Sequence, residues 1–159
     1  MKMKRSIRLL VVVWVAVCGV MTSGCWSAHP HSSFRAIHQC AINGDAMGVA
    51  RELAKFPDEI NLPEDGGLTP LHLAAENCHT NVVALLLDKG AKINVKADDS
   101  ATSLHLAAQE GCADVVKILM ARGAKINARD DQNRTPLDRA QQWHQTNIVA
   151  LLKQDGAIQ

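Results

Sequence analysis

The sequence repeats itself with a period of 33 residues, and this period restricts the possible folds more than any other feature. Segment 67–94 reads "GLTPLHLAAENCHTNVVALLLDKGAKIN", and segment 100–127 reads "SATSLHLAAQEGCADVVKILMARGAKIN". Equivalent residues at this spacing are Thr69, Thr102 and Thr135; Leu71, Leu104 and Leu137; Gly90, Gly123 and Gly156; and Asn61, Asn94 and Asn127. A fixed period of this length is typical of stacked architectures in which one small unit is copied along the chain.

Each unit has the pattern of two short helices followed by a turn. Thr69 can cap a helix, and Pro70 suits its first position, where no N–H is needed. A second helix is expected over about 81–89, and Gly90 can end it in a left-handed conformation. Its expected buried residues are Val82, Val83, Leu85, Leu86 and Leu87. Helices of eight to ten residues are unstable alone in water, so the leucines are buried only if the units stack.

The motifs "TPLHLAA", "VVALLL" and "GAKIN" at this spacing resemble the ankyrin-repeat family, from about residue 34 to 159. The resemblance implies an all-α ankyrin-repeat solenoid of about four helix-turn-helix repeats with β-turn or hairpin fingers. The repeats would cover about 34–63, 64–96, 97–129 and 130–159. It further implies that His72 and His105, with His38 as their counterpart, form hydrogen bonds within the turns.

The first and last units depart from the repeated pattern. The first lacks Thr-Pro, holds one extra residue and carries Pro57 near the place where a glycine is expected. The last has Asp138 in place of the histidine and Gln141 in place of an alanine. Terminal units of a stack are expected to be atypical because their outer faces meet water.

Residues 1–24 have the composition of a cleaved signal peptide. Four basic residues and no acidic ones precede a 13-residue apolar run, Leu9–Met21. This run is shorter than the roughly 20 residues of a bilayer span but suits the apolar core of a signal peptide. Without the leader, 13 basic and 16 acidic residues remain, a charge of −3 that indicates no attraction to nucleic acid.

The sequence "TSGC" that follows resembles a bacterial lipobox. This resemblance implies cleavage before Cys25, lipidation of Cys25 and a short polar tether over 25–33. Trp26 in place of an aspartate then favours the outer membrane facing the periplasm. Thr22 departs from the pattern, where an aliphatic residue is usual. Plain secretory cleavage and an uncleaved anchor therefore remain as alternatives.

Three further cysteines follow Cys25, and two of them suggest a disulfide. Cys78 stands where a glycine normally ends the first helix, and Cys112 lies one step further on in the next unit. Thiols in an oxidising periplasm can pair, provided that their Cα atoms lie within about 7 Å. Adjacent repeats could also hold the two farther apart. Cys40 falls on a core position and is interpreted as a small hydrophobic residue.

Motifs for catalysis, metals or cofactors are weak throughout. His29 and His31 supply only two ligands in a tether, and no zinc spacing is present. Ser100 and Ser103 lie near His105, but that histidine belongs to the repeat pattern and no third group is evident. No phosphate-binding loop or HExxH motif occurs. We therefore expect no enzyme, no metal, no cofactor and no small-molecule substrate.

The repeat pattern leaves the turn tips and the last residues of each first helix free for binding a protein partner. In the turns these are Asp65, Gly66, Leu68, Asp98, Asp99, Ala101, Asp131, Gln132 and Arg134. At the helix ends they are Glu76, Asn77, Gln109, Glu110, Gln142 and Trp143. A stack of this family presents a concave face made of these parts. The face is largely polar or acidic, which indicates either a basic partner or a merely solvated surface.

Trp143 is the only tryptophan of the repeats, and it occupies a position that the pattern leaves exposed. Tryptophan is enriched among the residues that dominate binding energy. The alternative is that Trp143 covers the open end of the last unit.

Taken together, these features predict a membrane-anchored protein-protein interaction module in the bacterial cell envelope, or in the periplasm if Cys25 carries no lipid. Resemblance to small ankyrin lipoproteins implies a sharper version of this role, an immunity or inhibitor protein against a secreted toxic effector. The alternative is an envelope-stress factor that supports another exported protein.

Overall fold

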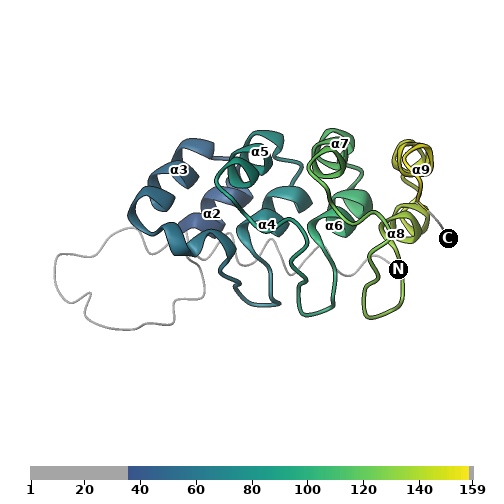
Figure 1. The fold of residues 1–159 in the computed structure, drawn as a ribbon, viewed down its shortest axis with the longest axis horizontal. Helices are drawn as coiled ribbons and strands as arrows, with labels where there is room; N and C mark the ends of the chain where they lie inside the picture. Colours follow the sequence, from purple (N-terminus) through teal and green to yellow (C-terminus); the bar gives the residue numbers. More distant parts are fainter. Residues whose placement is uncertain (1–35, 158–159) are drawn as a thin grey trace, which may run out of the picture. The chain divides into compact units, whose positions relative to one another are not determined.

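Eight α-helices in four pairs make up the part of the chain that the computed structural model describes, residues 36–157 (Figure 1). They are α2 (Ala36–Asn43), α3 (Ala46–Lys55), α4 (Pro70–Glu76), α5 (Thr80–Asp88), α6 (Ser103–Glu110), α7 (Ala113–Ala121), α8 (Pro136–Gln142) and α9 (Thr146–Gln154). A short 3-10 helix, η1 (Pro57–Asn61), follows α3. The predicted signal peptide, the tether 25–33 and the lipidation site Cys25 lie outside the described residues.

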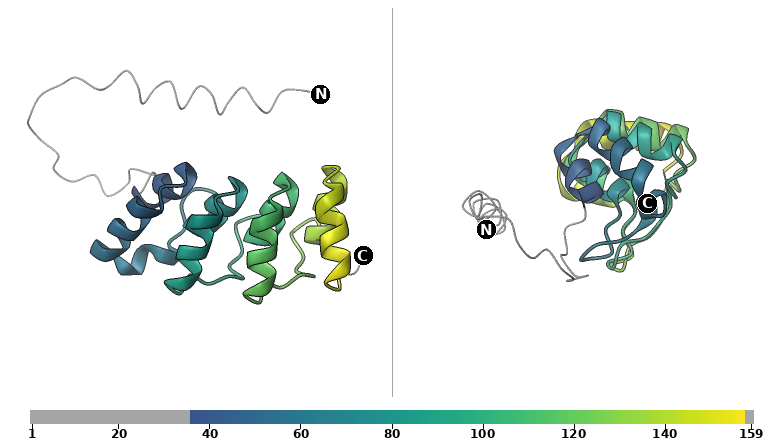
Figure 2. Two further views of the ribbon diagram at one scale, coloured as in Figure 1. Left: turned by 90° about the horizontal axis from the view of Figure 1, so that it is seen from above. Right: turned by 90° about the vertical axis from the view of Figure 1, so that its left-hand side faces the viewer.

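The helix pairs stack side by side in two rows. The first helices α2, α4, α6 and α8 form one row and pack against one another in order (Figure 1). The second helices α3, α5, α7 and α9 form the other row, and the successive pairs nearly superimpose when seen from the end (Figure 2). None of residues 36–157 forms a strand. The predicted all-α solenoid of four helix pairs is confirmed.

The first helices begin where the sequence predicts. Thr69 is the extended N-cap of α4, and Pro70 is its first residue. The Thr69 N–H donates to Nδ1 of His72 at 3.2 Å. Nε2 of His72 lies 3.1 Å from the carbonyl oxygen of Val95 in the next finger. Because a carbonyl oxygen only accepts, Nε2 is the donor and one imidazole joins two repeats.

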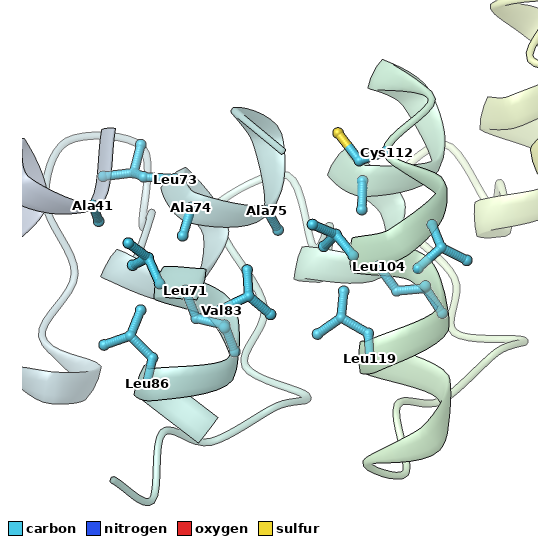
Figure 3. Close-up of a cluster of buried hydrophobic side chains, with 14 of the residues drawn as sticks. Ala41, Leu71, Leu73, Ala74, Ala75, Val83, Leu86, Leu104, Cys112 and Leu119 are labelled. Carbon is cyan, nitrogen blue, oxygen red and sulfur yellow. The ribbon is translucent and has the colours of Figure 1, made fainter. Parts of the chain in front are cut away.

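The core lies between the two rows and consists of leucine, valine, isoleucine and alanine. Leu71 of α4 packs with Val83 and Leu86 of α5, and all three are buried (Figure 3). Burial of Leu85 and Leu87 was also expected, but both are only half-buried. A helix turns by 100° per residue, so consecutive leucines cannot all face one core.

Three turns project as fingers on the side of the first helices (Figure 1). The base of the finger between α5 and α6 is closed by the Ala97 N–H, which donates to the Ala101 carbonyl at 2.8 Å. The prediction that Ala101 is free for binding is wrong, since its side chain is fully buried. This pairing and a contact with His72 hold Ala101 against the stack, away from the finger tip.

Replacing Ser103 by proline is expected to raise the free energy of unfolding by about 1 kcal/mol. Ser103 is the first residue of α6, is buried, and has a hydroxyl with no hydrogen-bond partner. The equivalent residues Pro70 and Pro136 show that proline fits this position. Urea denaturation measures the change. The control Ser103→Ala removes only the hydroxyl, so it should raise the free energy of unfolding by part of this amount. A Ser103→Pro protein less stable than the wild type would contradict the prediction.

Candidate protein-binding surface

The finger tips carry exposed aspartates. Asp65, Asp98, Asp99 and Asp131 are all exposed, one or two on each finger. The N–H of Asp98 donates to the Gly66 carbonyl at 3.0 Å, and the N–H of Asp131 donates to the Asp99 carbonyl at 3.0 Å. These backbone bonds hold neighbouring fingers together. The tips therefore form a continuous acidic edge.

The ends of the first helices supply the rest of the predicted surface. Asn77, Glu110, Gln142 and Trp143 are exposed, and Glu76 and Gln109 are half-buried. The first helices lie on the side from which the fingers project (Figure 1). We call these residues together with the exposed finger residues the finger face.

Trp143 is the most conspicuous apolar residue of the finger face. It caps the C-terminus of α8 and leaves 54% of its surface exposed. More than half of this residue can therefore contact a partner, and its role in binding stays a prediction beside that of a cover for the last unit.

A buried ion cluster at the base of the last finger was missed by the sequence reasoning. Arg139 of α8 is only 3% exposed. Its Nη2 lies 2.7 Å from Oδ2 of Asp130 and 2.9 Å from Oδ2 of Asp99. Arg139 stands at the position of Leu73 and Leu106 in the two preceding repeats. This exchange of leucine for arginine was the signal that could have revealed the cluster.

The cluster also engages residues that the sequence pattern had left free for a partner. The guanidinium of Arg134 pairs with Asp130 at 2.9 Å and donates to Gln142 at 3.0 Å. Arg139 donates to Gln109 at 3.4 Å and to Asp99 at 2.9 Å. The prediction that the side chains of Arg134, Gln142, Gln109 and Asp99 are free is therefore wrong, because each already has a partner within the protein. Intramolecular bonds fix the geometry of this part of the finger face.

Electrostatics keeps both carboxylates of the cluster ionised. Burial alone would raise the pKa of Asp130, but hydrogen bonds from the Arg134 backbone and from both guanidinium groups lower it far below the usual range. Burial also opposes ionisation of Asp99, and the hydrogen bond from Arg139 lowers its pKa overall. Both carboxylates are therefore charged at neutral pH and balance the charges of Arg134 and Arg139.

A disulfide joins Cys78 and Cys112 directly beside the finger face. Their Cα atoms are 5.1 Å apart, within the limit that a disulfide requires. Cys78 is exposed and Cys112 is buried. Cys40 is free and half-buried, so it fills the predicted core position only in part. Burial raises the pKa of the Cys40 thiol, and the nearby carboxylates of Asp45 and Glu52 raise it further.

Comparison with known proteins agrees with this geometry. Residues 19–97, 37–130 and 96–158 each match the family model described as "Ankyrin repeats (3 copies)". The chain belongs to the ankyrin-repeat family. Ankyrin repeats form a non-enzymatic fold for protein-protein interaction, and the described stack is such a module.

Three curated relatives share parts of this ankyrin chain. An "E3 ubiquitin-protein ligase" of Arabidopsis thaliana is 36% identical over 89 residues, 56% of this chain and 14% of the relative. A "Probable E3 ubiquitin-protein ligase" of Oryza sativa subsp. japonica is 59% identical over 34 residues, 21% of this chain and 7% of the relative. Human "Ankyrin repeat domain-containing protein 39" is 38% identical over 58 residues, 36% of this chain and 31% of that protein. The chain thus matches less than a third of each relative.

His105, the histidine nearest in sequence to Ser100 and Ser103, is engaged in the fold. Within residues 36–157, histidine, cysteine and acidic side chains form no group of three that could hold a metal ion. The helices of this part are also too short or too polar to span a bilayer. Nδ1 of His105 accepts from the Thr102 N–H, and Nε2 donates to the Arg134 carbonyl. Both nitrogens of this imidazole are therefore committed to the fold, which leaves neither to activate Ser100 or Ser103.

The ankyrin stack is expected to lose stability as the pH falls below about 6.5. Burial lowers the pKa of His72 and of His105. The unfolded chain therefore takes up protons at a pH where the native imidazoles stay neutral. Each of the two histidines lowers the free energy of unfolding by up to about 1.4 kcal/mol per unit of falling pH. Urea midpoints between pH 8 and pH 5 measure this effect. Equal midpoints at pH 7.5 and pH 5.5 would contradict it.

Proposed function

We propose that this ankyrin protein is a lipid-anchored adaptor of the bacterial cell envelope that binds a protein partner through its finger face. The observation that carries the binding role is Trp143, a large exposed aromatic residue at the end of α8, on the same face as the exposed aspartates, of which Asp99 is held in place by Arg139. A rigid aromatic residue with ordered polar neighbours is typical of binding hot spots.

The envelope location rests on two features of the chain. Residues 1–24 have the pattern of a signal peptide and end at the lipobox-like "TSGC". The Cys78–Cys112 disulfide supports export, because stable disulfides belong mainly to oxidising compartments. The outer membrane facing the periplasm is the proposed site, with lipid on Cys25.

The charge of the finger face favours a basic partner. The exposed aspartates of the finger tips stand beside Glu110 and the half-buried Glu76 at the helix ends. Such a field speeds the encounter with a positively charged surface, and salt weakens it. We therefore propose a protein with a basic patch as the partner.

The anchor is tested by the substitution Cys25→Ala. We expect the altered protein to incorporate no labelled palmitate and, provided that the leader is still cleaved, to lose membrane association. Cys18→Ala is the matched control, because this cysteine lies in the leader and would be removed with it. A wild-type protein that incorporates no labelled palmitate, or a Cys25→Ala protein that incorporates as much as the wild type, would refute the lipid anchor.

Binding is tested by affinity capture from a periplasmic extract, followed by titration of the captured protein. Trp143→Ala should weaken the complex by at least about tenfold. Phe56→Ala is the matched control, because Phe56 follows α3 and is also 54% exposed. If Trp143→Ala binds like the wild type, the finger face is not the site.

The same titration separates two more specific roles. An inhibitor or immunity protein against a toxic effector should bind one partner with nanomolar affinity or better and block its activity. A factor that supports another exported protein should bind more weakly and leave the partner's activity intact. The two roles therefore differ in measured affinity and in the partner's activity.

A further inference from the structure

The repeats of the stack are linked by a recurrent contact at the start of the second helices. His79 is the N-cap of α5, and its Nε2 donates to the Ile42 carbonyl of α2 at 2.8 Å. Gln145 is the N-cap of α9, and its Nε2 donates to the Gln109 carbonyl of α6 at 3.1 Å. At the first and third interfaces, a side-chain hydrogen bond from the N-cap thus reaches back to the preceding repeat, and at the first interface Asn81 donates a second one to the Gly44 carbonyl at 3.1 Å.

The middle interface uses a covalent bond at the same place. Cys112 is the N-cap of α7, and it reaches back to Cys78, which follows the end of α4. A thiol is a weak hydrogen-bond donor and cannot replace the imidazole or amide of the neighbouring interfaces. When the disulfide is reduced, the middle interface therefore keeps no equivalent link.

The backbone conformation at Cys78 is a second reason why the middle interface depends on the disulfide. Its φ is 60°, in the left-handed region, and the equivalent residues of the first and third repeats are Gly44 and Gly111 with φ of 73° and 80°. A residue with a Cβ atom is disfavoured in this conformation. This cost is present in both redox states, but the disulfide offsets it only in the oxidised protein.

The disulfide is accessible to a reductant. Cys78 is exposed, and a hollow of about 180 Å³ lies beside the bond, lined by Cys78, Thr80, Cys112, Ala113, Asp114 and Val115. A thiolate of a dithiol reductant can attack Sγ of Cys78 and release Cys112 as a thiolate, which takes a proton from water. The second thiolate of the reductant then displaces Cys78. The reductant becomes a cyclic disulfide, and two electrons pass to the protein.

We infer that the Cys78–Cys112 pair is a redox-dependent joint: when oxidised it links the start of α7 covalently to the preceding repeat, and when reduced it leaves the middle interface without the N-cap link that the two flanking interfaces keep. The joint lies directly after Asn77 and two residues after Glu110, both on the finger face. The oxidation state thereby controls how firmly the centre of that face is held. This inference does not require the lipid anchor.

Hydrogen exchange of the purified full chain, read by mass spectrometry, tests the joint. Addition of dithiothreitol should speed exchange around Cys78 and Cys112 by roughly 30-fold or more. Exchange around Ile42 and Gln145 at the flanking interfaces should change much less. An equal change at all three interfaces, or no change at the middle one, would overturn the inference.

A variant that copies the third interface gives an independent test. Cys78→Gly with Cys112→Gln places the Gly111 and Gln145 pair at the middle interface. Its exchange should not respond to dithiothreitol and should lie between the oxidised and reduced wild type. Cys78→Gly with Cys112→Ala is the control, and it should exchange about 2- to 10-fold faster for lack of the amide hydrogen bond. Equal exchange in the two variants would refute the role given to the link.

Discussion

Replacing Arg139 by leucine is expected to lower the free energy of unfolding by about 3 kcal/mol, although leucine occupies the equivalent position in the two preceding repeats. The change removes the partner of Asp130, which is only 6% exposed, and of Asp99. Breaking a buried pair leaves a charge without compensation, which usually costs 3–5 kcal/mol. The lower end applies because Arg134 still pairs with Asp130. Urea denaturation at pH 7 measures the loss.

The control for this prediction comes from the chain itself. The double variant Asp130→Ala with Arg139→Leu rebuilds the combination of Ala97 and Leu106 found one repeat earlier. We expect it to be more stable than Arg139→Leu, because no buried carboxylate is left without its partner, but less stable than the wild type, because Asp130 also accepts from the N–H groups of Gln132 and Arg134. A double variant as unstable as Arg139→Leu would show that the cluster contributes more than mutual compensation of its charges.

Replacing His105 by alanine is expected to cost about 3 kcal/mol. The buried imidazole accepts from the Thr102 N–H at 3.1 Å and lies 3.1 Å from the carbonyl oxygen of Arg134, to which it donates. Alanine leaves both backbone groups without this partner and opens a cavity between α6 and the last finger. Each unsatisfied buried group costs about 1–3 kcal/mol. Urea denaturation measures the effect at pH 7.5, where the imidazole is neutral in the native and unfolded states.

A control at another histidine and a second substitution of His105 show how His105 acts. His144→Asn changes an exposed histidine with a φ of 58°, a conformation that asparagine tolerates, and should alter stability by less than about 0.5 kcal/mol. His105→Asp copies Asp138, whose carboxylate accepts from the Thr135 N–H at 2.8 Å. It should be at least as costly as His105→Ala, because it buries a charge and leaves the Arg134 carbonyl unpaired. A stable His105→Asp protein would show that only the cap matters.

At Asp138 the last repeat departs from the pattern. In the described residues, His72 and His105 each cap their own helix and also donate to the next finger. The Asp138 carboxylate accepts from the N–H and the hydroxyl of Thr135, but a carboxylate cannot donate to a carbonyl oxygen. The exchange of histidine for aspartate thus retains the cap of the helix and not the donated hydrogen bond.

The sequence by itself determined the helix pairs and their stacking. Thr69 and Pro70 begin a helix, Gly90 ends the second one, and apolar residues at helical spacing face the core. These effects act within about ten residues, so the pattern of one unit is enough to predict them. The 33-residue period then requires each unit to bury its leucines against its copies.

Only the tertiary structure decided which distant side chains meet. Arg139 reaches Asp99, 40 residues earlier, and the disulfide spans 34 residues. Ala101 is buried for the same kind of reason, because it lies against the stack beside His72. Contacts of this kind depend on the offset between neighbouring repeats. A distance of a few ångströms separates an ion pair or a disulfide from two unconnected side chains, and a repeat pattern does not specify it.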